Sequence, residues 1–344
     1  MTTMKAIKVT RPGGAEIQGV PLPRLRDDYV LCRVNQVAIN PTDWKHIDFI
    51  PAPGATSGCD FAGSVEQVGP AVSKDWRKGD RIAAFVHGCN ATNLEDGCFA
   101  EFAVAKGDLQ MKIPDNLSDE QAATLGVGLT TVGLALYQTL GLPLPPSKPS
   151  GVPVLIYGGS TATGSLAIQF AALSGYEVIT TCSPRNFVFV QKLGASKAFN
   201  YKDSACGAKI RKYTNDALKL AFDCISHDNS AKICCEAISS GGGKMCSLNP
   251  TAHPRADVKN IHMLAYTVND EEFEMGNSLI PAKPDDLEFG KMFWELATKL
   301  IAESTISTHP TLACTGGLEG VLHGINQLRE GKLSRKKLVY NLVS

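Results

Sequence analysis

The sequence predicts an α/β protein with two domains, and two observations on its pattern lead there. Short candidate strands separated by Gly, Pro and Asp clusters fill about the first third of the chain, which is typical of an antiparallel, barrel-like domain. From residue 152 on, strands and helices alternate, which is typical of a doubly wound parallel sheet that binds nucleotides. A length of 344 residues is enough for two such domains.

The individual elements follow from apolar patterning and turn residues. In the first part, strands are expected at residues 5–9, 29–39, 63–68, 81–86 and 100–105. Ser118 and Gln121 form a capping box that opens an apolar helix, and a Pro-rich loop follows at residues 141–151. The second part carries expected strands at 152–157, 177–182, 198–200, 220–225 and 244–248, with helices at 165–173, 187–193 and 231–238. Residues 250–285 are expected to be irregular, before an amphipathic helix at 289–302 and a last strand at 337–343.

Composition excludes several classes of function. Lys plus Arg and Asp plus Glu both number 34, and zero net charge argues against binding to nucleic acid or to an anionic membrane. No run of 18 apolar residues predicts a membrane span, and the first residues lack the apolar core of a signal peptide. Eleven scattered cysteines are expected to be reduced thiols. We therefore expect a cytoplasmic protein.

The strongest local signal is the glycine-rich turn at residues 158–164, GGSTATG, which lies between an apolar strand and a helix. The amino end of such a helix offers unpaired N–H groups to a pyrophosphate, and Gly164 lets helix and strand pack closely. Thr161 stands where the usual pattern has its middle glycine. We expect the pyrophosphate at Ser160, Thr161, Ala162 and Thr163. The alternative is an ordinary strand–turn–helix corner.

The end of the second strand predicts which dinucleotide binds. NAD-specific folds have a carboxylate about 20 residues after the turn, to bind the ribose hydroxyls. Here that position reads Ser183, Pro184, Arg185 and Asn186, and an Arg guanidinium matches the geometry of a 2′-phosphate. The sequence thus predicts NADPH, with Tyr201 covering the adenosine. The alternative is a plain helix start, with Ser183 as N-cap and Pro184 as the first helical residue.

Several motifs carry a family resemblance over nearly the whole chain. Residues 40–45 (NPTDWK), 58–63 (GCDFAG), 78–81 (KGDR) and 158–164 resemble the quinone-reductase-like branch of the medium-chain dehydrogenase/reductase superfamily. Residues 124–145, 157–164, 181–187 (TCSPRNF) and 246–250 (CSLNP) resemble the trans-acting enoyl reductases of fungal polyketide synthases, of the lovastatin enoyl-reductase type. These enzymes use NADPH to reduce a carbon–carbon double bond in a polyketide thioester.

The resemblance implies a fold, a partner and a place in metabolism. It implies a GroES-like catalytic domain at residues 1–122, completed by 270–344, and a Rossmann NADPH-binding domain at 123–269. The substrate is then an enoyl thioester on the acyl carrier domain of a polyketide synthase, or of a polyketide synthase–peptide synthetase hybrid, in secondary metabolism. We expect a monomer, because a docking enzyme benefits from an uncovered surface.

Zinc is not expected. Zinc-dependent relatives use a Cys where this chain has Asn40, and a His-Glu pair where it has Cys59 and Asp60. Only Cys89 and Cys98 lie in the region of the structural zinc lobe, which requires four cysteines. Asp60 is expected to cap local structure instead. Without a Lewis acid, reduction of an activated double bond is favoured over alcohol oxidation.

The resemblance also assigns residues to the site. The catalytic candidates are Lys45, which would stabilise the developing oxyanion, and Thr130, which would orient the nicotinamide and substrate; the alternatives are a surface lysine and a helix-interior threonine. Further cofactor contacts are expected at Thr42, Asp43, Trp44, Arg335 and Lys336. Leu248 and Asn249 are expected there for a different reason, because they follow a strand at the carboxyl end of the parallel sheet, where ligands bind. The acyl group is expected at Gly128, Leu129, Thr130, Thr131, Val132, Gly133, Leu134, Ala135, Tyr266, Thr267 and Val268.

Some questions stay open at this level. Tyr137, His262 and water are candidates for the proton donor to the α-carbon. Lys332 with residues 335–337 forms a basic run that could dock an acidic carrier domain or could simply be solvated. The main alternative function is a free-standing NADPH-dependent quinone or alkenal reductase acting on small molecules. A second is an NADPH-binding protein without catalysis, crystallin-like or RNA-binding, and the neutral charge weighs against RNA.

Overall fold

A computed structural model describes residues 3–343 and divides into two compact units. The first unit takes the chain up to Thr130 and again from Tyr266, and the second takes Thr131–Ala265. These limits lie eight residues after the expected division at 122/123 and four residues before the expected division at 269/270. None of the helices among residues 3–343 has the length and hydrophobicity that a membrane span requires.

The first unit is built on a seven-stranded sheet with the order β16-β17-β3-β4-β5-β7, and β6 pairs with β3 beside this path. Its strands are β3 (Tyr29–Ala38), β4 (Asp60–Val68), β5 (Arg81–Phe85), β6 (Phe102–Lys106), β7 (Met111–Lys112), β16 (Thr311–Cys314) and β17 (Lys337–Asn341). The C-terminal strand β17 pairs antiparallel with β3, so the last expected strand does return to the first part of the chain. A separate hairpin is formed by β1 (Thr3–Arg11) and β2 (Gly14–Pro21).

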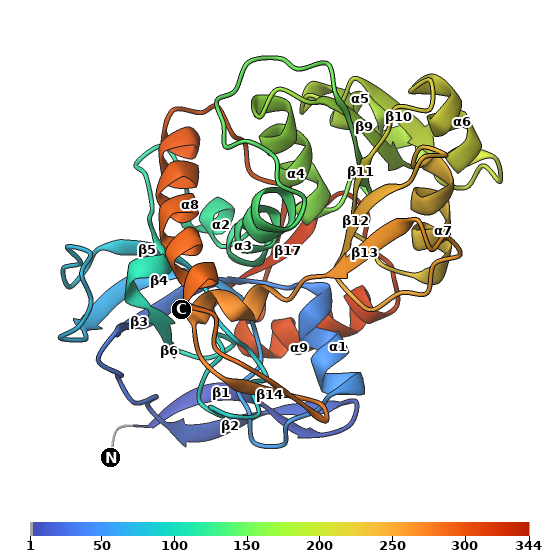
Figure 1. Cartoon of the computed structure of the whole chain (residues 1–344). Coiled ribbons are helices and arrows are strands. Elements are labelled where there is room, and N and C mark those ends of the chain that lie inside the picture. The colour runs from blue at the N-terminus through green and yellow to red at the C-terminus, as the bar shows by residue number, and fades with distance from the viewer. Residues whose placement is uncertain (1–2, 344) are drawn as a thin grey trace. The chain divides into compact units, whose positions relative to one another are not determined.

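The helices of the first unit carry several of the expected site residues. They are α1 (Pro41–Phe49), α2 (Asp119–Ala122), α3 (Gly126–Val132), α8 (Pro284–Ala302) and α9 (Gly317–Arg329), as Figure 1 shows. The capping box at the start of α2 is confirmed, because the Gln121 N–H donates to Ser118 Oγ at 3.2 Å. Helix α8 begins at Pro284, five residues earlier than its apolar periodicity predicts. Pro is favoured in a first helical turn, where its missing N–H needs no partner.

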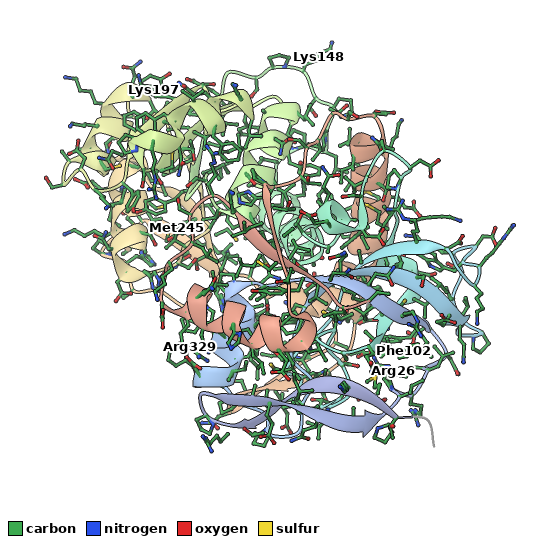
Figure 2. The ribbon with its side chains drawn as sticks, turned by 180° about the vertical axis from the view of Figure 1, so that it is seen from behind. Arg26, Phe102, Lys148, Lys197, Met245 and Arg329 are labelled. Atoms are coloured by element: carbon green, nitrogen blue, oxygen red, sulfur yellow. The ribbon has the colours of Figure 1, made fainter. Side chains whose placement is uncertain are left out.

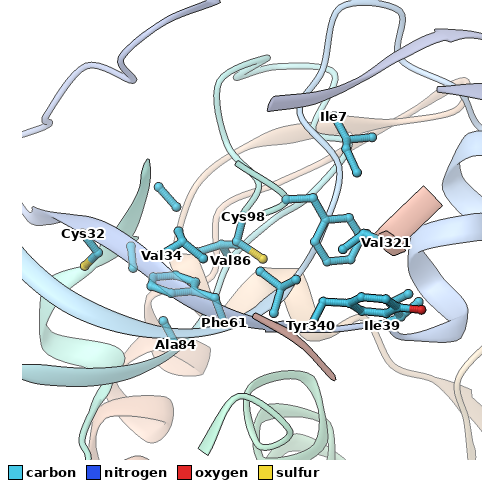
Figure 3. Close-up of a cluster of buried hydrophobic side chains, with 14 of the residues drawn as sticks. Ile7, Cys32, Val34, Ile39, Phe61, Ala84, Val86, Cys98, Val321 and Tyr340 are labelled. Atoms are coloured by element: carbon cyan, nitrogen blue, oxygen red, sulfur yellow. The ribbon is translucent and has the colours of Figure 1, made fainter. Parts of the chain in front are cut away.

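The core of the first unit joins residues from both ends of the chain. Ile7, Phe61, Val321 and Tyr340 lie in one buried cluster, drawn in Figure 3. Each large apolar side chain buried in this way stabilises the fold by about 1.5–3 kcal/mol. The N-terminal and C-terminal segments therefore fold as one body.

The second unit is a six-stranded, wholly parallel sheet with the order β10-β9-β8-β11-β12-β13 (Figure 1). Its strands are β8 (Pro153–Tyr157), β9 (Glu177–Cys182), β10 (Lys197–Asn200), β11 (Leu220–Asp223), β12 (Gly243–Ser247) and β13 (Val258–His262). Its helices include α4 (Ala162–Leu173), α5 (Phe187–Lys192), α6 (Cys206–Tyr213) and α7 (Asp228–Ala237). Because the order reverses next to β8, this is the doubly wound sheet that the alternating pattern predicts.

The expectation of irregular structure over residues 250–285 is wrong. Strand β13 extends the parallel sheet, and β14 (Phe273–Met275) pairs with β15 (Ser278–Ile280) as a hairpin. Strand β13 reads VKNIH, and only Val258 of it is fully buried. An edge strand lacks the continuous apolar run of an interior parallel strand, so its periodicity is too weak to detect.

Candidate active site

Helix α1 of the first unit begins with a fixed turn. The Asn40 N–H donates to Asp43 Oδ2 at 2.6 Å, and Pro41 occupies the first helical position. At the carboxyl end of α1, Asp48 accepts through both carboxylate oxygens from the Arg329 guanidinium of α9 (Figure 2), at 2.9 and 2.7 Å. A bidentate pair fixes orientation as well as distance. The side chains that α1 presents are therefore held in place.

Asp60 is the centre of a buried polar cluster in the same unit. Its Oδ2 accepts from Asn40 Nδ2 at 2.9 Å and from Lys337 Nζ, and its Oδ1 accepts from the Val127 N–H at 2.5 Å. The carboxylate therefore caps the amino end of α3, as expected of a structural Asp. Lys337 does not belong to the exposed basic run that the sequence suggests. It is buried against Asp60, while Lys336 is exposed.

The residues at the zinc positions of related enzymes do not fit that metal. Both oxygens of Asp60 are occupied, Asn40 supplies an amide, and burial raises the pKa of the Cys59 thiol well above its usual range. Zinc binds cysteine as the thiolate, which this environment disfavours. Across residues 3–343 no group of three or more His, Cys, Asp or Glu side chains is arranged to hold a metal ion.

Thr42 and Tyr266 lie in direct contact, although 224 positions separate them in the sequence. Their hydroxyl oxygens are 2.7 Å apart, and the Tyr266 hydroxyl also lies 3.6 Å from Cys59 Sγ. His46 Nδ1 is 3.0 Å from the Thr42 hydroxyl and 2.8 Å from the Thr42 carbonyl oxygen. His87 stacks on the Tyr266 ring with centroids 3.9 Å apart. Sequence reasoning missed both histidines, because neither belongs to a motif.

The two catalytic candidates have different surroundings. Lys45 is half-buried on α1, and burial lowers the pKa of its ammonium group. Trp44 beside it is half-buried and meets Phe49 edge-on at 5.8 Å. Thr130 is buried on α3, where its Oγ1 accepts from Trp294 Nε1 at 3.2 Å. Trp294 thereby fixes the rotamer of Thr130. The two residues are far apart in the sequence, and no local sequence pattern predicts their contact.

The other expected acyl-site residues are mostly buried. Residues 128–135 are all buried, over α3 and the π-helical turn at Gly133–Thr139. In the first unit, Val268 is buried, and the Thr267 hydroxyl donates to Asp286 Oδ2 of α8. Arg335 and Lys336 are exposed just before β17.

In the second unit, hydrogen bonds of the Thr161 side chain hold the glycine-rich turn together. Its Oγ1 donates to the Gly158 carbonyl at 2.8 Å and accepts from the Gly164 N–H at 3.0 Å, so Thr161 is the N-cap of α4. This use of the hydroxyl explains why a β-branched residue replaces the usual glycine. Ser160, Ala162 and Thr163 are partly exposed at the amino end of the helix.

At two positions of the turn, neighbouring atoms lie so close to the backbone that only glycine fits. A Cβ on Gly164 would lie 2.3 Å from the Gly158 carbonyl oxygen, which confirms the packing role expected for Gly164. A Cβ on Gly159 would lie 2.0 Å from Thr180 Oγ1 of β9. The N–H groups of Gly158, Gly159, Thr161 and Gly164 donate within the unit, so the place that fits a pyrophosphate is the amino end of α4 at Ala162 and Thr163.

The remaining expected cofactor residues of the second unit lie at the same sheet edge, because they follow the carboxyl ends of parallel strands. Ser183, Pro184, Arg185 and Asn186 follow β9, with Ser183 as N-cap and Pro184 as the first residue of a short 3₁₀ turn. Asn186 is buried, whereas Arg185 is exposed and has no ion pair within the described residues. Tyr201 follows β10 and packs on the sheet's apolar cluster. Leu248 and Asn249 follow β12, and the Leu248 N–H donates to Ser226 Oγ at 2.7 Å.

Both side chains considered as proton donors have other partners. The Tyr137 hydroxyl lies 3.1 Å from Ser174 Oγ and is buried within the second unit. His262 Nε2 lies 3.3 Å from the Leu248 carbonyl oxygen, and burial lowers the pKa of His262.

Comparison with known proteins decides the family. Residues 26–115 match the family model of the alcohol dehydrogenase GroES-like domain, and residues 162–270 match that of zinc-binding dehydrogenases. The chain is 46% identical to trans-enoyl reductase resD of Aspergillus sclerotiorum, over 98% of this chain and all of that protein. It is 44% identical to trans-enoyl reductase ACTTS2 of Alternaria alternata, over 99% of this chain and all of that protein. The chain belongs to the trans-enoyl reductases.

Solved structures confirm the fold of this trans-enoyl reductase. An alcohol dehydrogenase superfamily protein from Novosphingobium aromaticivorans superposes with a TM-score of 0.81 at 21% identity, with full coverage of both chains. The CurK enoyl reductase superposes with a TM-score of 0.75 at 18% identity, over 99% of both chains. The architecture is thus a GroES-like domain joined to a Rossmann-type domain, as expected. The enzyme is an oxidoreductase of the medium-chain superfamily, and its glycine-rich turn fits a nicotinamide dinucleotide.

Proposed function

We propose that this trans-enoyl reductase uses NADPH to reduce an α,β-unsaturated polyketide thioester held on the acyl carrier domain of a partner synthase. The observation that carries the proposal is the likeness to trans-enoyl reductases over 98–99% of the chain. The donor set at the zinc positions agrees with a reaction that needs no metal, since a thioester already activates the double bond.

The exposed guanidinium of Arg185 supports NADPH as the dinucleotide. It stands at the carboxyl end of β9, a place where NAD-specific folds have a carboxylate. Ser183 beside it offers a hydroxyl and the amino end of a 3₁₀ turn. In this assignment Arg185 and Ser183 hold the 2′-phosphate and Tyr201 covers the adenosine. The N–H groups of Ser160, Ala162 and Thr163 hold the pyrophosphate, since that of Thr161 donates to the Gly158 carbonyl oxygen.

When bound, NADPH supplies the hydride that adds to the β-carbon of the substrate. The protein then has to stabilise negative charge on the thioester oxygen, and Lys45 is proposed to place its ammonium there. Thr42 and Trp44 on α1 are assigned to the nicotinamide half, and so are Leu248 and Asn249 after β12. Asp43, also expected there, is 1% exposed and accepts from the Asn40 N–H, so it takes no direct part. Thr130, oriented by Trp294, positions the carboxamide and the acyl group.

Docking of the carrier domain is assigned to the exposed cations Lys332, Arg335 and Lys336, called the basic surface below, although Lys332 is paired with Glu330. This assignment replaces the cofactor contact expected for Arg335 and Lys336. Carrier domains that present acidic side chains would be attracted to it at low ionic strength. Lys337 takes no part, because it is buried against Asp60.

The activity is tested with a crotonyl-type pantetheine thioester and either NADPH or NADH. We expect loss of reduced-nicotinamide absorbance with NADPH, formation of the saturated thioester, and far slower reaction with NADH. A panel of quinones and alkenals under the same conditions tests the free-standing reductase. Rapid quinone reduction with no thioester turnover would replace the proposed function by that alternative.

A further inference from the structure

We propose that Ser226 is a positioning residue for the nicotinamide half of the dinucleotide. Its hydroxyl, oriented by Asp223, fixes the place of Leu248 and thereby of Asn249 next to it. The inference rests on the proposed function, which assigns Leu248 and Asn249 to that half of the cofactor.

Three strands of the parallel sheet end side by side in the second unit (Figure 1). Asp223, the last residue of β11, is paired with Tyr157 of β8 on one side and with Ser247 of β12 on the other. The segments that follow these strands therefore start from one edge of the sheet, where doubly wound folds bind ligands. The first of these segments is the glycine-rich turn, the second carries Ser226, and the third begins with Leu248.

Asp223 folds the segment after β11 into a tight turn. Its Oδ1 accepts from the N–H groups of Ile225 and Ser226, at 3.0 and 2.9 Å. Its other carboxylate oxygen lies 2.5 Å from Ser230 Oγ, in the first turn of α7. The Ser226 hydroxyl donates to the Asp223 carbonyl oxygen at 2.8 Å. Because a hydroxyl has one hydrogen, this bond fixes its direction and leaves the Ser226 oxygen to accept.

The Ser226 oxygen holds the backbone of Leu248. It accepts from the Leu248 N–H at 2.7 Å, across 22 positions of sequence. At the other backbone group of the same residue, His262 Nε2 lies 3.3 Å from the Leu248 carbonyl oxygen. A carbonyl oxygen can only accept, so Nε2 is the donor. Side chains of two other segments therefore hold both backbone polar groups of Leu248, and this restricts where Asn249 can lie.

The backbone of Ser226 adopts an unfavourable conformation. Its φ is +56°, in the left-handed region, where a Cβ lies too close to the backbone, and the residue is only 3% exposed. Glycine adopts this conformation without that cost. What serine adds over glycine at this position is the hydroxyl that holds Leu248.

The turn at residues 223–226 also packs on the glycine-rich turn. A Cβ on Gly158 would lie 2.9 Å from Ile225 Cγ1, and the Cys224 N–H donates to the Tyr157 carbonyl oxygen at 3.1 Å. The turn therefore connects the segment that leads to the proposed pyrophosphate site with the segment assigned to the nicotinamide. In this way it sets the spacing between the two.

Two ligands separate positioning of the nicotinamide from damage to the fold. NADPH has both halves of the dinucleotide, whereas adenosine 2′,5′-bisphosphate has the adenosine and the 2′-phosphate without the nicotinamide. Ser226→Gly removes the hydroxyl and suits the backbone conformation. We expect its dissociation constant for NADPH to rise about fivefold, as for one lost hydrogen bond, while that for the bisphosphate stays unchanged. Asn215→Gly, exposed and also at positive φ in this unit, is the matched control for the backbone effect.

Hydride transfer should respond more strongly than binding. At saturating NADPH, kcat of Ser226→Gly should fall about tenfold or more, because a small misplacement of the reacting carbon is costly. Asp223→Ala removes the acceptor that folds the turn and should resemble Ser226→Gly. Asp223→Asn keeps an oxygen for both N–H groups and can donate to Ser230 Oγ, so it should restore most of the affinity for NADPH.

The comparison of the two ligands can overturn the inference. An unchanged dissociation constant for NADPH in Ser226→Gly would show that the hydroxyl holds nothing that the cofactor needs. An equal rise for both ligands, or failure of Ser226→Gly to fold, would assign the hydroxyl to the fold alone. A wild type that binds NADPH but reduces no enoyl thioester would instead refute the proposed function, and the binding comparison would still decide the role of Ser226.

Discussion

The Lys337 ammonium donates to the Asp60 carboxylate across 277 positions of sequence, and both side chains are buried. Lys337 also donates to the Thr124 carbonyl oxygen at 3.1 Å. The pair joins the C-terminal strand β17 to the start of β4 and to the helical segment that carries Thr130.

Removing one member of this pair should destabilise the first unit. Lys337→Met leaves the Asp60 charge buried and unpaired, which typically costs about 3–5 kcal/mol of unfolding free energy. Combining it with Asp60→Asn should restore part of the loss, because no charge is then left buried. Lys336→Met, one residue away and exposed, is the matched control. Urea unfolding midpoints measure the effect, and equal midpoints for Lys337→Met and Lys336→Met would contradict the account.

Gly164→Ala should weaken cofactor binding and lower stability. The added Cβ would lie 2.3 Å from the Gly158 carbonyl oxygen, so the turn must move away from the helix. We expect at least tenfold weaker dinucleotide binding by fluorescence titration. Gly19→Ala is the control, because no atom lies within 4 Å of its added Cβ. Binding by Gly164→Ala with wild-type affinity would show that the turn does not hold the pyrophosphate.

Arg185→Ala should weaken the binding of NADPH and leave the binding of NADH nearly unchanged. Loss of a charge-assisted contact to phosphate costs roughly 1.5–3 kcal/mol, which corresponds to about a tenfold or larger rise in the NADPH dissociation constant. NADH has no 2′-phosphate, so its affinity should stay nearly the same. Lys192→Ala, an exposed cation at the end of α5, controls for net charge. Equal loss for both dinucleotides would refute the phosphate assignment.

Charge reversal on the basic surface should weaken carrier docking alone. Replacing Lys332 and Lys336 by Glu is expected to raise KM for a carrier-bound substrate several-fold, with a strong dependence on salt. KM for the same acyl group on free pantetheine should not change. If both substrates are affected equally, these lysines act on the fold or on the cofactor instead of on the carrier.

The stability that two buried acids contribute to the fold should decrease as the pH rises through 6 and 7. Burial raises the pKa of Asp43 to about 7 and that of Asp96 to about 6, both above the unfolded values. Stability from these acids is fully present below the unfolded pKa near 4 and is lost as pH rises through 6 and 7. Asp43→Asn should flatten the upper part of this decline in urea midpoints. A wild-type midpoint that rises between pH 4 and 7 would contradict the buried acids.

Local chemistry made much of this molecule predictable. The glycine-rich turn, the Ser118 capping box and the alternating strands are set by residues close in sequence, and the structure confirms them. Tertiary partners were not predictable. Trp294 on Thr130, Tyr266 on Thr42 and Lys337 on Asp60 join distant segments, and no periodicity records which side chains will meet. For that reason the sequence alone places Lys337 in an exposed basic run, although the structure buries it.

The central claim is tested most directly by following the hydride itself. NADPH deuterated at C4 on the transferred face is reacted with an enoyl pantetheine thioester in ordinary water, and the product is analysed by mass spectrometry and NMR. The account predicts one deuterium on the β-carbon and none on the α-carbon. Deuterium on the α-carbon, or saturated product without deuterium, would contradict it.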